Sequence, residues 1–244
     1  MKPFRKNLAI TIDGGGIRGI IPAKALTMLE TELGAPIFKY MRLASGTSTG
    51  SIIAAGLASG IPTAVLLTMY MQLGNTLFKR SFGYWLWLLR GYRYSHQPLV
   101  DYFSPMLKGK TLGDLWNTKP STALVVTTFD MVSNETRFLK SWKPQNQHWT
   151  VLNAVLASAA APTYLPVMEG RYSDGGIGSY NNPCFIAAYE FSKHLGWDEK
   201  DTTLISLGTG RARNHVKVGE PSRYGALKWL PTVIETHAQD ASDQ

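Results

Sequence analysis

Short apolar runs rich in β-branched residues alternate along this chain with longer segments whose apolar residues recur every three or four positions. The short runs predict buried strands, and the longer segments predict helices with one apolar face. Strands are predicted at residues 7–12, 41–45, 122–129, 136–142 and 203–207. Helices are predicted at residues 21–33, 51–57, 151–161 and 184–195. This alternation predicts an α/β fold of three layers, with a central, mainly parallel sheet and helices on both faces.

Composition narrows the class of protein. A length of 244 residues suffices for one large domain with a sizeable core. The formal net charge of +8 favours an anionic partner, either nucleic acid or an anionic membrane surface. Cys184 is the only cysteine, which excludes an intramolecular disulfide and suits a reducing compartment. The first residues show no secretory signal, and no apolar run is long enough to span a membrane, so we expect a cytoplasmic location.

Residues 46–50 read Gly-Thr-Ser-Thr-Gly and follow the predicted strand 41–45. The pattern G-x-S-x-G is typical of a nucleophile elbow, in which a serine, here Ser48, lies at a strained corner between a strand and a helix. Gly46 and Gly50 would remove side chains where strand and helix crowd each other. The same pattern also occurs in plain glycine- and serine-rich turns. It therefore indicates a nucleophile only together with other motifs.

Glycines at residues 14–16 and 19 lie between the predicted strand 7–12 and the helix 21–33. Free backbone N–H groups at a helix amino terminus attract anions. Three interpretations are open: an oxyanion hole, a dinucleotide-binding loop, or a tight turn. A dinucleotide-binding loop requires an acidic residue about 20 positions further on, at the end of a second strand. Glu30 and Glu32 come too early for that position and fall on the predicted helix.

The span from Glu32 to Asp101 contains no acidic residue between its ends. Aromatic and basic side chains gather within it at residues 79–94. Tryptophan and tyrosine beside arginine and lysine are typical of a membrane interface, although large aromatic residues also build protein cores. We therefore consider residues 79–94 as a membrane-facing rim, with a place in the core as the alternative.

Taken in order, the motifs resemble those of the patatin-like phospholipases, a family of lipid acyl hydrolases. The matching segments are residues 13–19, 46–50, 157–166, 174–176, 181–183 and 206–210. Each segment is modest alone, but the ordered set is specific and spans residues 8–210. The resemblance implies a single patatin-like domain over residues 1–244, in which the part after about residue 210 matches little. Whether the natural chain continues beyond Gln244 stays open.

The resemblance also implies a site. The nucleophile would be Ser48 and its base Asp174, which precedes two glycines. The further implied residues are Gly14, Gly15, Gly16 and Thr49 for the oxyanion hole, Arg18 for a substrate phosphate, and Gly46, Gly50, Gly175 and Gly176 as structural support. A serine hydroxyl is a poor nucleophile until a base takes its proton. A free aspartate has a pKa of about 3.9, so Asp174 would need desolvation to serve as a base at neutral pH.

Histidine is the usual base for a serine nucleophile, but none of the five histidines follows an expected strand end or glycine loop. They are His96, His148, His194, His215 and His237. His194 falls late in a predicted helix, where it would complement the helix dipole. The residues themselves therefore give no clear Ser-His pair, and the Ser-Asp dyad comes from the resemblance.

No cluster of metal ligands and no calcium-loop pattern occurs in the sequence. We therefore expect a calcium-independent hydrolase that forms an acyl-enzyme and needs no cofactor. Its expected partners are a phospholipid or other glycerolipid substrate and, peripherally, an anionic membrane surface, with no nucleic acid. Two alternatives stay open: a dinucleotide-binding protein that uses residues 14–19, and a lipid-binding module with an inactive site. The head group, the ester position, the acyl length and the oligomeric state are not specified.

Overall fold

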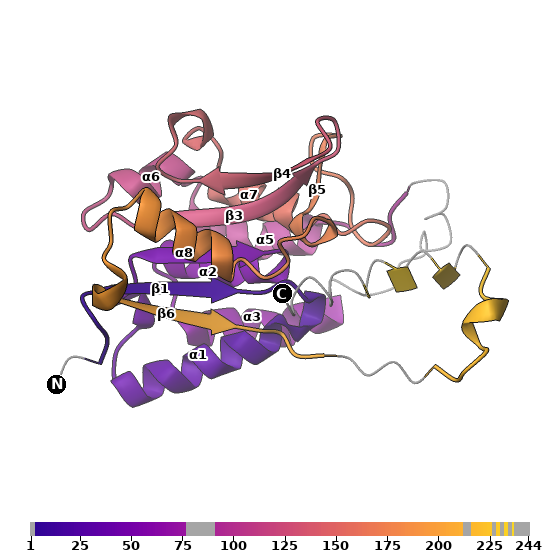
Figure 1. The fold of residues 1–244 in the computed structure, drawn as a ribbon, viewed down its shortest axis with the longest axis horizontal. Coiled ribbons are helices and arrows are strands. Elements are labelled where there is room, and N and C mark those ends of the chain that lie inside the picture. The colour runs from indigo at the N-terminus through magenta and orange to yellow at the C-terminus, as the bar shows by residue number, and fades with distance from the viewer. Residues whose placement is uncertain are drawn as a thin grey trace.

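The computed structural model describes residues 3–76, 91–211 and 216–225, together with 228–229, 232–233 and 236. The described residues form one six-stranded sheet, in which five strands lie in the order β4-β3-β2-β1-β6. These strands are β1 (Asn7–Ile12), β2 (Leu43–Thr47), β3 (Ala123–Asp130), β4 (Glu135–Lys140) and β6 (Thr202–Leu207). Strands β6, β1, β2 and β3 are parallel, and β4 returns antiparallel to β3 at the edge. The predicted α/β class with a mainly parallel sheet is confirmed (Figure 1).

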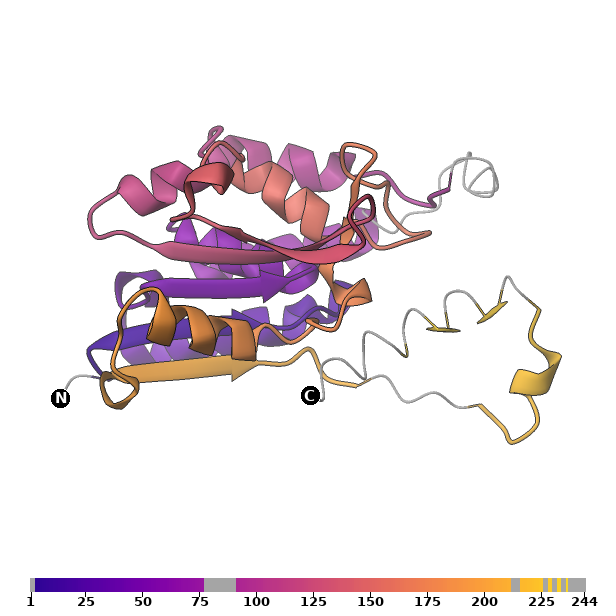
Figure 2. The ribbon, with the colours of Figure 1, turned by 45° about the horizontal axis from the view of Figure 1, so that its top comes forward.

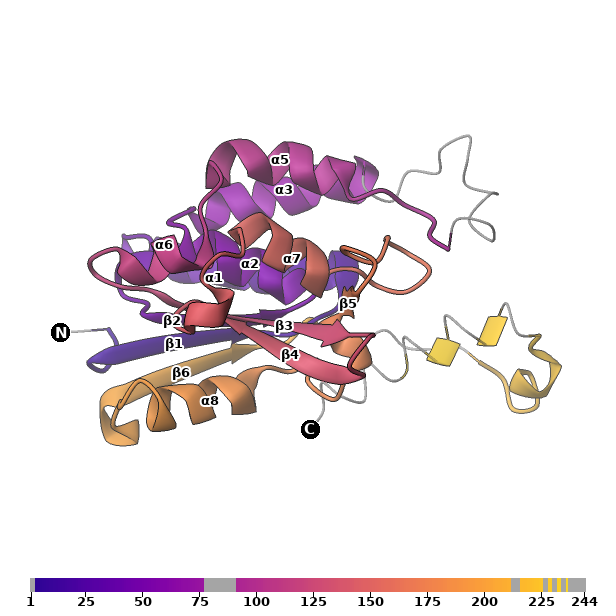
Figure 3. The same ribbon diagram turned by 90° about the horizontal axis from the view of Figure 1, so that it is seen from above.

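Helices cover both faces of the sheet, but unequally (Figure 3). The helices are α1 (Ile20–Leu33), α2 (Thr49–Ala58), α3 (Thr63–Thr76), α5 (Gln97–Leu107), α6 (Leu112–Asn117), α7 (Val151–Ser158) and α8 (Cys184–Lys193). The larger core joins Leu8, Ile10 and Ile12 of β1 to side chains of α1, α2, α3, α5 and α7. The opposite face carries a smaller cluster, in which Ile186 and Phe191 of α8 pack against the sheet. Successive residues of a strand point to opposite faces, so an uninterrupted apolar run such as β1 can contribute to both cores.

The predicted elements are present, with shifted ends. The strand predicted at 41–45 lies at Leu43–Thr47, directly before the corner of the elbow. The helix predicted at 151–161 ends three residues early, because α7 stops at Ser158 and the chain turns there. Strand β5 (Tyr172–Asp174) was not predicted, since three residues are too few to show a periodic pattern.

Strands β2 and β5 occupy the same side of β3, one after the other. Thr47, the last residue of β2, lies opposite Thr127, and Asp174, the last residue of β5, lies opposite Thr128. Strand β2 is parallel to β3 and β5 is antiparallel to it, so the two strands run towards each other. Their carboxyl ends therefore meet at the end of the sheet towards which the parallel strands point, which is to the right in Figure 2.

Candidate active site

Ser48 is the single residue between β2 and α2, and its backbone is in an unusual conformation. Its φ is 52° and its ψ is −123°, a region that side-chain-bearing residues rarely occupy. The flanking glycines make this corner possible. A Cβ at Gly46 would collide with the backbone of Gly50, and a Cβ at Gly50 would collide with the carbonyl group of Ile12. The G-x-S-x-G pattern therefore corresponds to a sharp turn from strand to helix that holds the serine at its apex.

The Ser48 hydroxyl donates a hydrogen bond to Asp174, with 2.5 Å between Oγ and Oδ2. Asp174 is 5% exposed, and burial raises its pKa to about 6, although the hydrogen bonds from Ser48 and from the backbone N–H of Gly176 oppose this rise. A carboxyl group that titrates near neutral pH is a better proton acceptor than a solvated aspartate. The serine hydroxyl is thus in hydrogen-bond contact with a buried carboxyl group whose pKa is raised.

The loop after β5 orients the carboxylate of Asp174. The N–H of Gly176 donates to Oδ1 of Asp174 at 2.8 Å, which leaves Oδ2 towards Ser48. Glycine is required here by close contacts. A Cβ at Gly175 would collide with the carbonyl oxygen of Thr127, and one at Gly176 would lie 2.7 Å from Oδ1 of Asn181.

The glycine loop lies between β1 and α1, as expected. Gly14 does not offer a free donor, since its N–H is bonded to the carbonyl oxygen of Asn181 at 3.2 Å. The carbonyl oxygen of Gly14 accepts bonds from Thr209 Oγ1 at 2.7 Å and from Asn181 Nδ2 at 3.4 Å. Within the described part of the chain, the N–H groups of Gly15, Gly16 and Thr49 have no hydrogen-bond partner. These three groups remain available to a developing negative charge.

A family model described as Patatin-like phospholipase matches residues 10–188, which is most of the chain. The chain belongs to the patatin-like phospholipase family. A cGAMP-activated phospholipase of Pseudomonas aeruginosa is 28% identical over 90% of this chain and 67% of its own length. Patatin-like protein 2 of Arabidopsis thaliana is 27% identical over 96% of this chain and 69% of its own length.

Among solved structures, VipD from Legionella pneumophila has a similar fold, with a TM-score of 0.50 and 15% sequence identity. The match covers 86% of this chain and 51% of the VipD chain, so the chain spans about half the length of that protein. At this level of identity the likeness concerns the patatin-like fold alone.

Three polar residues of the patatin-like site were not assigned a role from the sequence: Ser158, Asn181 and Thr209. Ser158 is fully buried at the end of α7; its Oγ accepts the N–H of Ser48 at 2.8 Å and donates to the carbonyl oxygen of Thr127 at 2.6 Å. Asn181 and Thr209 both hold the glycine loop through Gly14. Their motifs, residues 157–166, 181–183 and 206–210, were part of the family resemblance, and this was the available signal.

The other charged and titratable side chains that the sequence singled out are not hydrogen-bonded to Ser48 or Asp174 among the described residues. Arg18 lies half-buried in the short 3₁₀ helix η1 (Gly16–Gly19) and forms no hydrogen bond or ion pair with Ser48 or Asp174. Asp13, at the end of β1, is buried, and burial raises its pKa to about 7. Among the described histidines, His194 lies 3.9 Å from Glu190 beyond α8, and burial lowers the pKa of His96 to about 4. In the described part of the chain no histidine is bonded to Ser48 or Asp174, and positions 215 and 237 lie outside it.

Of the rim expected at residues 79–94, residues 79–90 lie outside the described residues. Its last residues are described: Tyr92 forms a parallel bridge to Thr163, and the Tyr94 ring stacks on that of Tyr164 with centroids 6.3 Å apart. The described helices include none that is long and apolar enough to cross a membrane. Over the same residues, no group of three histidine, cysteine or acidic side chains is placed to hold a metal ion.

Proposed function

We propose that this chain is a serine-dependent lipid acyl hydrolase that cleaves acyl ester bonds of membrane glycerolipids. The observation that supports this most directly is the 2.5 Å hydrogen bond from the Ser48 hydroxyl to the buried carboxylate of Asp174. Membership of the patatin-like phospholipase family supports an ester substrate in a lipid. The head group and the position of the ester are left open.

The proposed reaction has two half-reactions. Ser48 Oγ attacks the ester carbonyl carbon while Asp174 takes the hydroxyl proton, and the carbonyl oxygen becomes an oxyanion. The N–H groups of Gly15, Gly16 and Thr49 stabilise that charge, because they have no partner among the described residues. The tetrahedral intermediate collapses, the leaving alcohol takes the proton from Asp174, and an acyl-enzyme remains. Water, deprotonated by Asp174, then attacks the acyl-enzyme. The second intermediate collapses, Ser48 Oγ takes the proton back from Asp174, and the fatty acid is released.

Two further proposals concern the conditions of the reaction. The mechanism uses no metal ion, so hydrolysis should be calcium-independent. The enzyme would work at the surface of a membrane rather than within it, as a peripheral protein. Arg18 is a candidate contact for a lipid phosphate because η1 directly follows the glycine loop.

Labelling with a fluorophosphonate probe, followed by peptide mapping, tests the nucleophile. The probe should modify Ser48 and leave Ser45 and Ser51 unmodified, because Ser45 is buried within β2 and the Ser51 hydroxyl is bonded to the Ser48 carbonyl oxygen. Ser48→Ala should abolish both labelling and ester hydrolysis while the melting temperature is retained. A folded protein that resists labelling yet binds vesicles would favour an inactive lipid-binding module. Tight binding of a nucleotide at residues 14–19 would favour the dinucleotide alternative.

A further inference from the structure

The turn between β3 and β4 carries two adjacent apolar side chains on the protein surface. Met131 is 54% exposed and Val132 is 72% exposed. Single exposed apolar residues are common, so neither residue alone indicates a function. Together they form the tip of a hairpin at residues 131–134, which we call the hairpin tip.

The hairpin tip lies beyond the proposed active site, at the same end of the sheet. Thr128 of β3 is level with Asp174, and β3 continues to Asp130 before the chain turns. With about 3.3 Å per strand residue, Asp130 lies about 7 Å past the level of Asp174, and Met131 and Val132 follow it in the turn. The β3–β4 hairpin, seen in Figure 1, therefore extends past the level of Asp174, at the end of the sheet where β2 and β5 meet.

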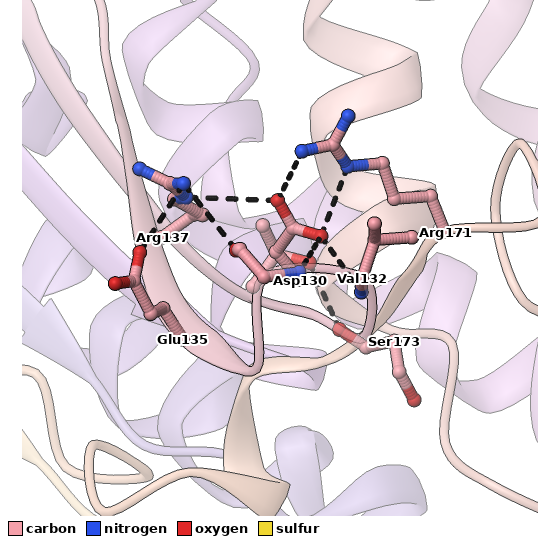
Figure 4. Close-up of polar contacts among 8 residues, drawn as sticks. Asp130, Val132, Glu135, Arg137, Arg171 and Ser173 are labelled. Carbon is pink, nitrogen blue, oxygen red and sulfur yellow. Dashed lines mark hydrogen bonds and ion pairs between the residues drawn. The ribbon is translucent and has the colours of Figure 1, made fainter.

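The hairpin tip is held in place by the buried carboxylate of Asp130 (Figure 4). Asp130 Oδ1 accepts the N–H of Val132 at 3.0 Å, and Arg171 donates to both carboxylate oxygens, at 2.9 and 2.6 Å. Arg137 adds an ion pair at 3.6 Å. The hydrogen bond from Arg171 keeps the pKa of Asp130 well below its usual range. These contacts fix the turn that carries the two apolar side chains.

The charges behind the hairpin tip cancel, but the arginine side chains are far more exposed to solvent than the aspartate between them. The side chains of Arg137 and Arg171 are 48% and 43% exposed, whereas the Asp130 carboxylate between them is 1% exposed. In Figure 4 each guanidinium keeps one nitrogen outside the marked contacts. Among the described residues, these nitrogens have no acceptor. They are suited to phosphate oxygens, which arginine binds readily. Glu135 pairs with Arg137 at 3.2 Å, so the four side chains together carry no net charge.

A second group of apolar side chains lies just after the glycine loop and in the last part of α3. Ile17, Ile21 and Met71 are all exposed. Ile17 lies against Gly74, one turn of α3 beyond Met71. Ile17 directly follows Gly16, whose N–H is a proposed oxyanion donor. Apolar side chains therefore occur on two separate elements at the same end of the sheet as Ser48.

We propose that the hairpin tip inserts Met131 and Val132 into the outer part of a lipid leaflet, while Arg137 and Arg171 contact lipid phosphates at the level of the head groups. An apolar point with guanidinium donors behind it matches the order of apolar and phosphate layers in a membrane surface. This proposal rests on the proposed function, because it names the surface on which the ester substrate is met. Since the charges behind the tip cancel, phosphatidylcholine suffices and binding depends little on salt. This weak salt dependence distinguishes the hairpin tip from an electrostatic rim, whose binding to vesicles would weaken as the salt concentration rises.

The test uses the full chain with Ser48→Ala, so that vesicles are not consumed. Binding to pure phosphatidylcholine vesicles is measured by sedimentation for the parent, for Val132→Asp and for Met28→Asp. Met28 is a matched control, because it is 58% exposed on α1, about two turns of helix past Ile21. Val132→Asp should weaken partitioning by about tenfold or more, because it loses an apolar side chain and adds a charge to be desolvated. Met28→Asp should leave binding unchanged.

Depth is measured separately with Val132→Trp and Met28→Trp, using phosphatidylcholine brominated on its acyl chains. Bromine should quench added fluorescence at position 132 and not at position 28. Equal binding of Val132→Asp and Met28→Asp, or no quenching at position 132, would overturn the proposal, as would a parent protein that does not bind vesicles. Hydrolysis of a short soluble ester, measured with Ser48 intact, should be unaffected by Val132→Asp. If the protein with Ser48 intact does not hydrolyse that ester, the proposed function is contradicted instead, and the binding results stand apart from it.

Discussion

Ser158 is expected to position the nucleophile, and replacing it with alanine tests that role. Its hydroxyl accepts the N–H of Ser48 and donates to the carbonyl oxygen of Thr127. Ser48 holds an unfavourable backbone conformation, with φ at 52°, so the bond to its N–H acts on the most strained peptide of the site. Ser158→Ala removes this acceptor and leaves both backbone groups buried and unpaired.

Two magnitudes follow from these contacts. Leaving a buried donor unsatisfied costs about 1–3 kcal/mol of stability. In a protein of this size, each kcal/mol lowers the melting temperature by about 2–4 °C, so a fall of about 2–12 °C is expected. The peptide of Ser48 will also relax away from its position. Because a displacement of about 1 Å can cost a factor of about 100 in rate, we expect kcat on a soluble ester to fall by about 10- to 100-fold with little change in KM.

Ser141 supplies a matched control for this experiment. It is also fully buried, and its hydroxyl accepts the N–H of Leu124 at 3.0 Å and donates to the carbonyl oxygen of Thr122 at 3.4 Å. These contacts lie at the start of β3, away from Ser48. Both variants should lose similar stability, but only Ser158→Ala should lose kcat. If the two variants keep equal activity when compared at equal distance below their melting temperatures, the positioning role is refuted.

The remaining predictions concern the dyad, pH and metal. Asp174→Asn should remove activity about as fully as Ser48→Ala, because the effects of residues that act as a unit are not additive. Each of the five His→Ala variants should stay active, and one folded but inactive histidine variant would indicate a triad. Since Asp174 must be deprotonated to act as a base and burial raises its pKa to about 6, kcat/KM should rise as pH increases to about 6 and then level off; a profile that is flat down to pH values well below that would contradict this base. EGTA should leave hydrolysis of a soluble ester unchanged, and a strict requirement for added calcium would refute the metal-free mechanism.

The sequence predicted best the elements in which most residues are apolar and build the core. Strand β1 and residues 52–58 of α2 are mostly apolar, so the pattern alone locates them. The elbow glycines were predicted from crowding, and a Cβ at either position does collide with backbone. Local sequence could therefore identify the corner that carries Ser48, because the Gly46 collision is with Gly50, although the Gly50 collision is with the distant Ile12 of β1.

Other parts of the site depend on contacts that are distant in sequence. Strand β5 has three residues and exists because β3 offers hydrogen bonds beyond the end of β2. The hydroxyl of Ser158 reaches a residue 110 positions away, which no local pattern reveals. Gly14 was expected to be an oxyanion donor, but its N–H is used to join the loop to Asn181. A glycine motif predicts free N–H groups as a class and does not specify which of them stays free.

The placement of Ser48 and Asp174 follows from two adjacent residues of β3. The carbonyl oxygen of Thr127 holds Ser158, which in turn holds the N–H of Ser48. The hydroxyl of Thr128 donates to the carbonyl oxygen of Ser173, at 2.8 Å, and so fixes the strand that ends in Asp174. Both residues of the pair are therefore positioned by the same stretch of β3 backbone, next to the edge strand β4. Because neighbouring residues of a strand cannot move independently by much, the Ser48–Asp174 distance is set by the register of β2 and β5 on β3. A change that shifts β5 by one residue would turn Asp174 to the opposite face and remove the base without altering any residue of the site.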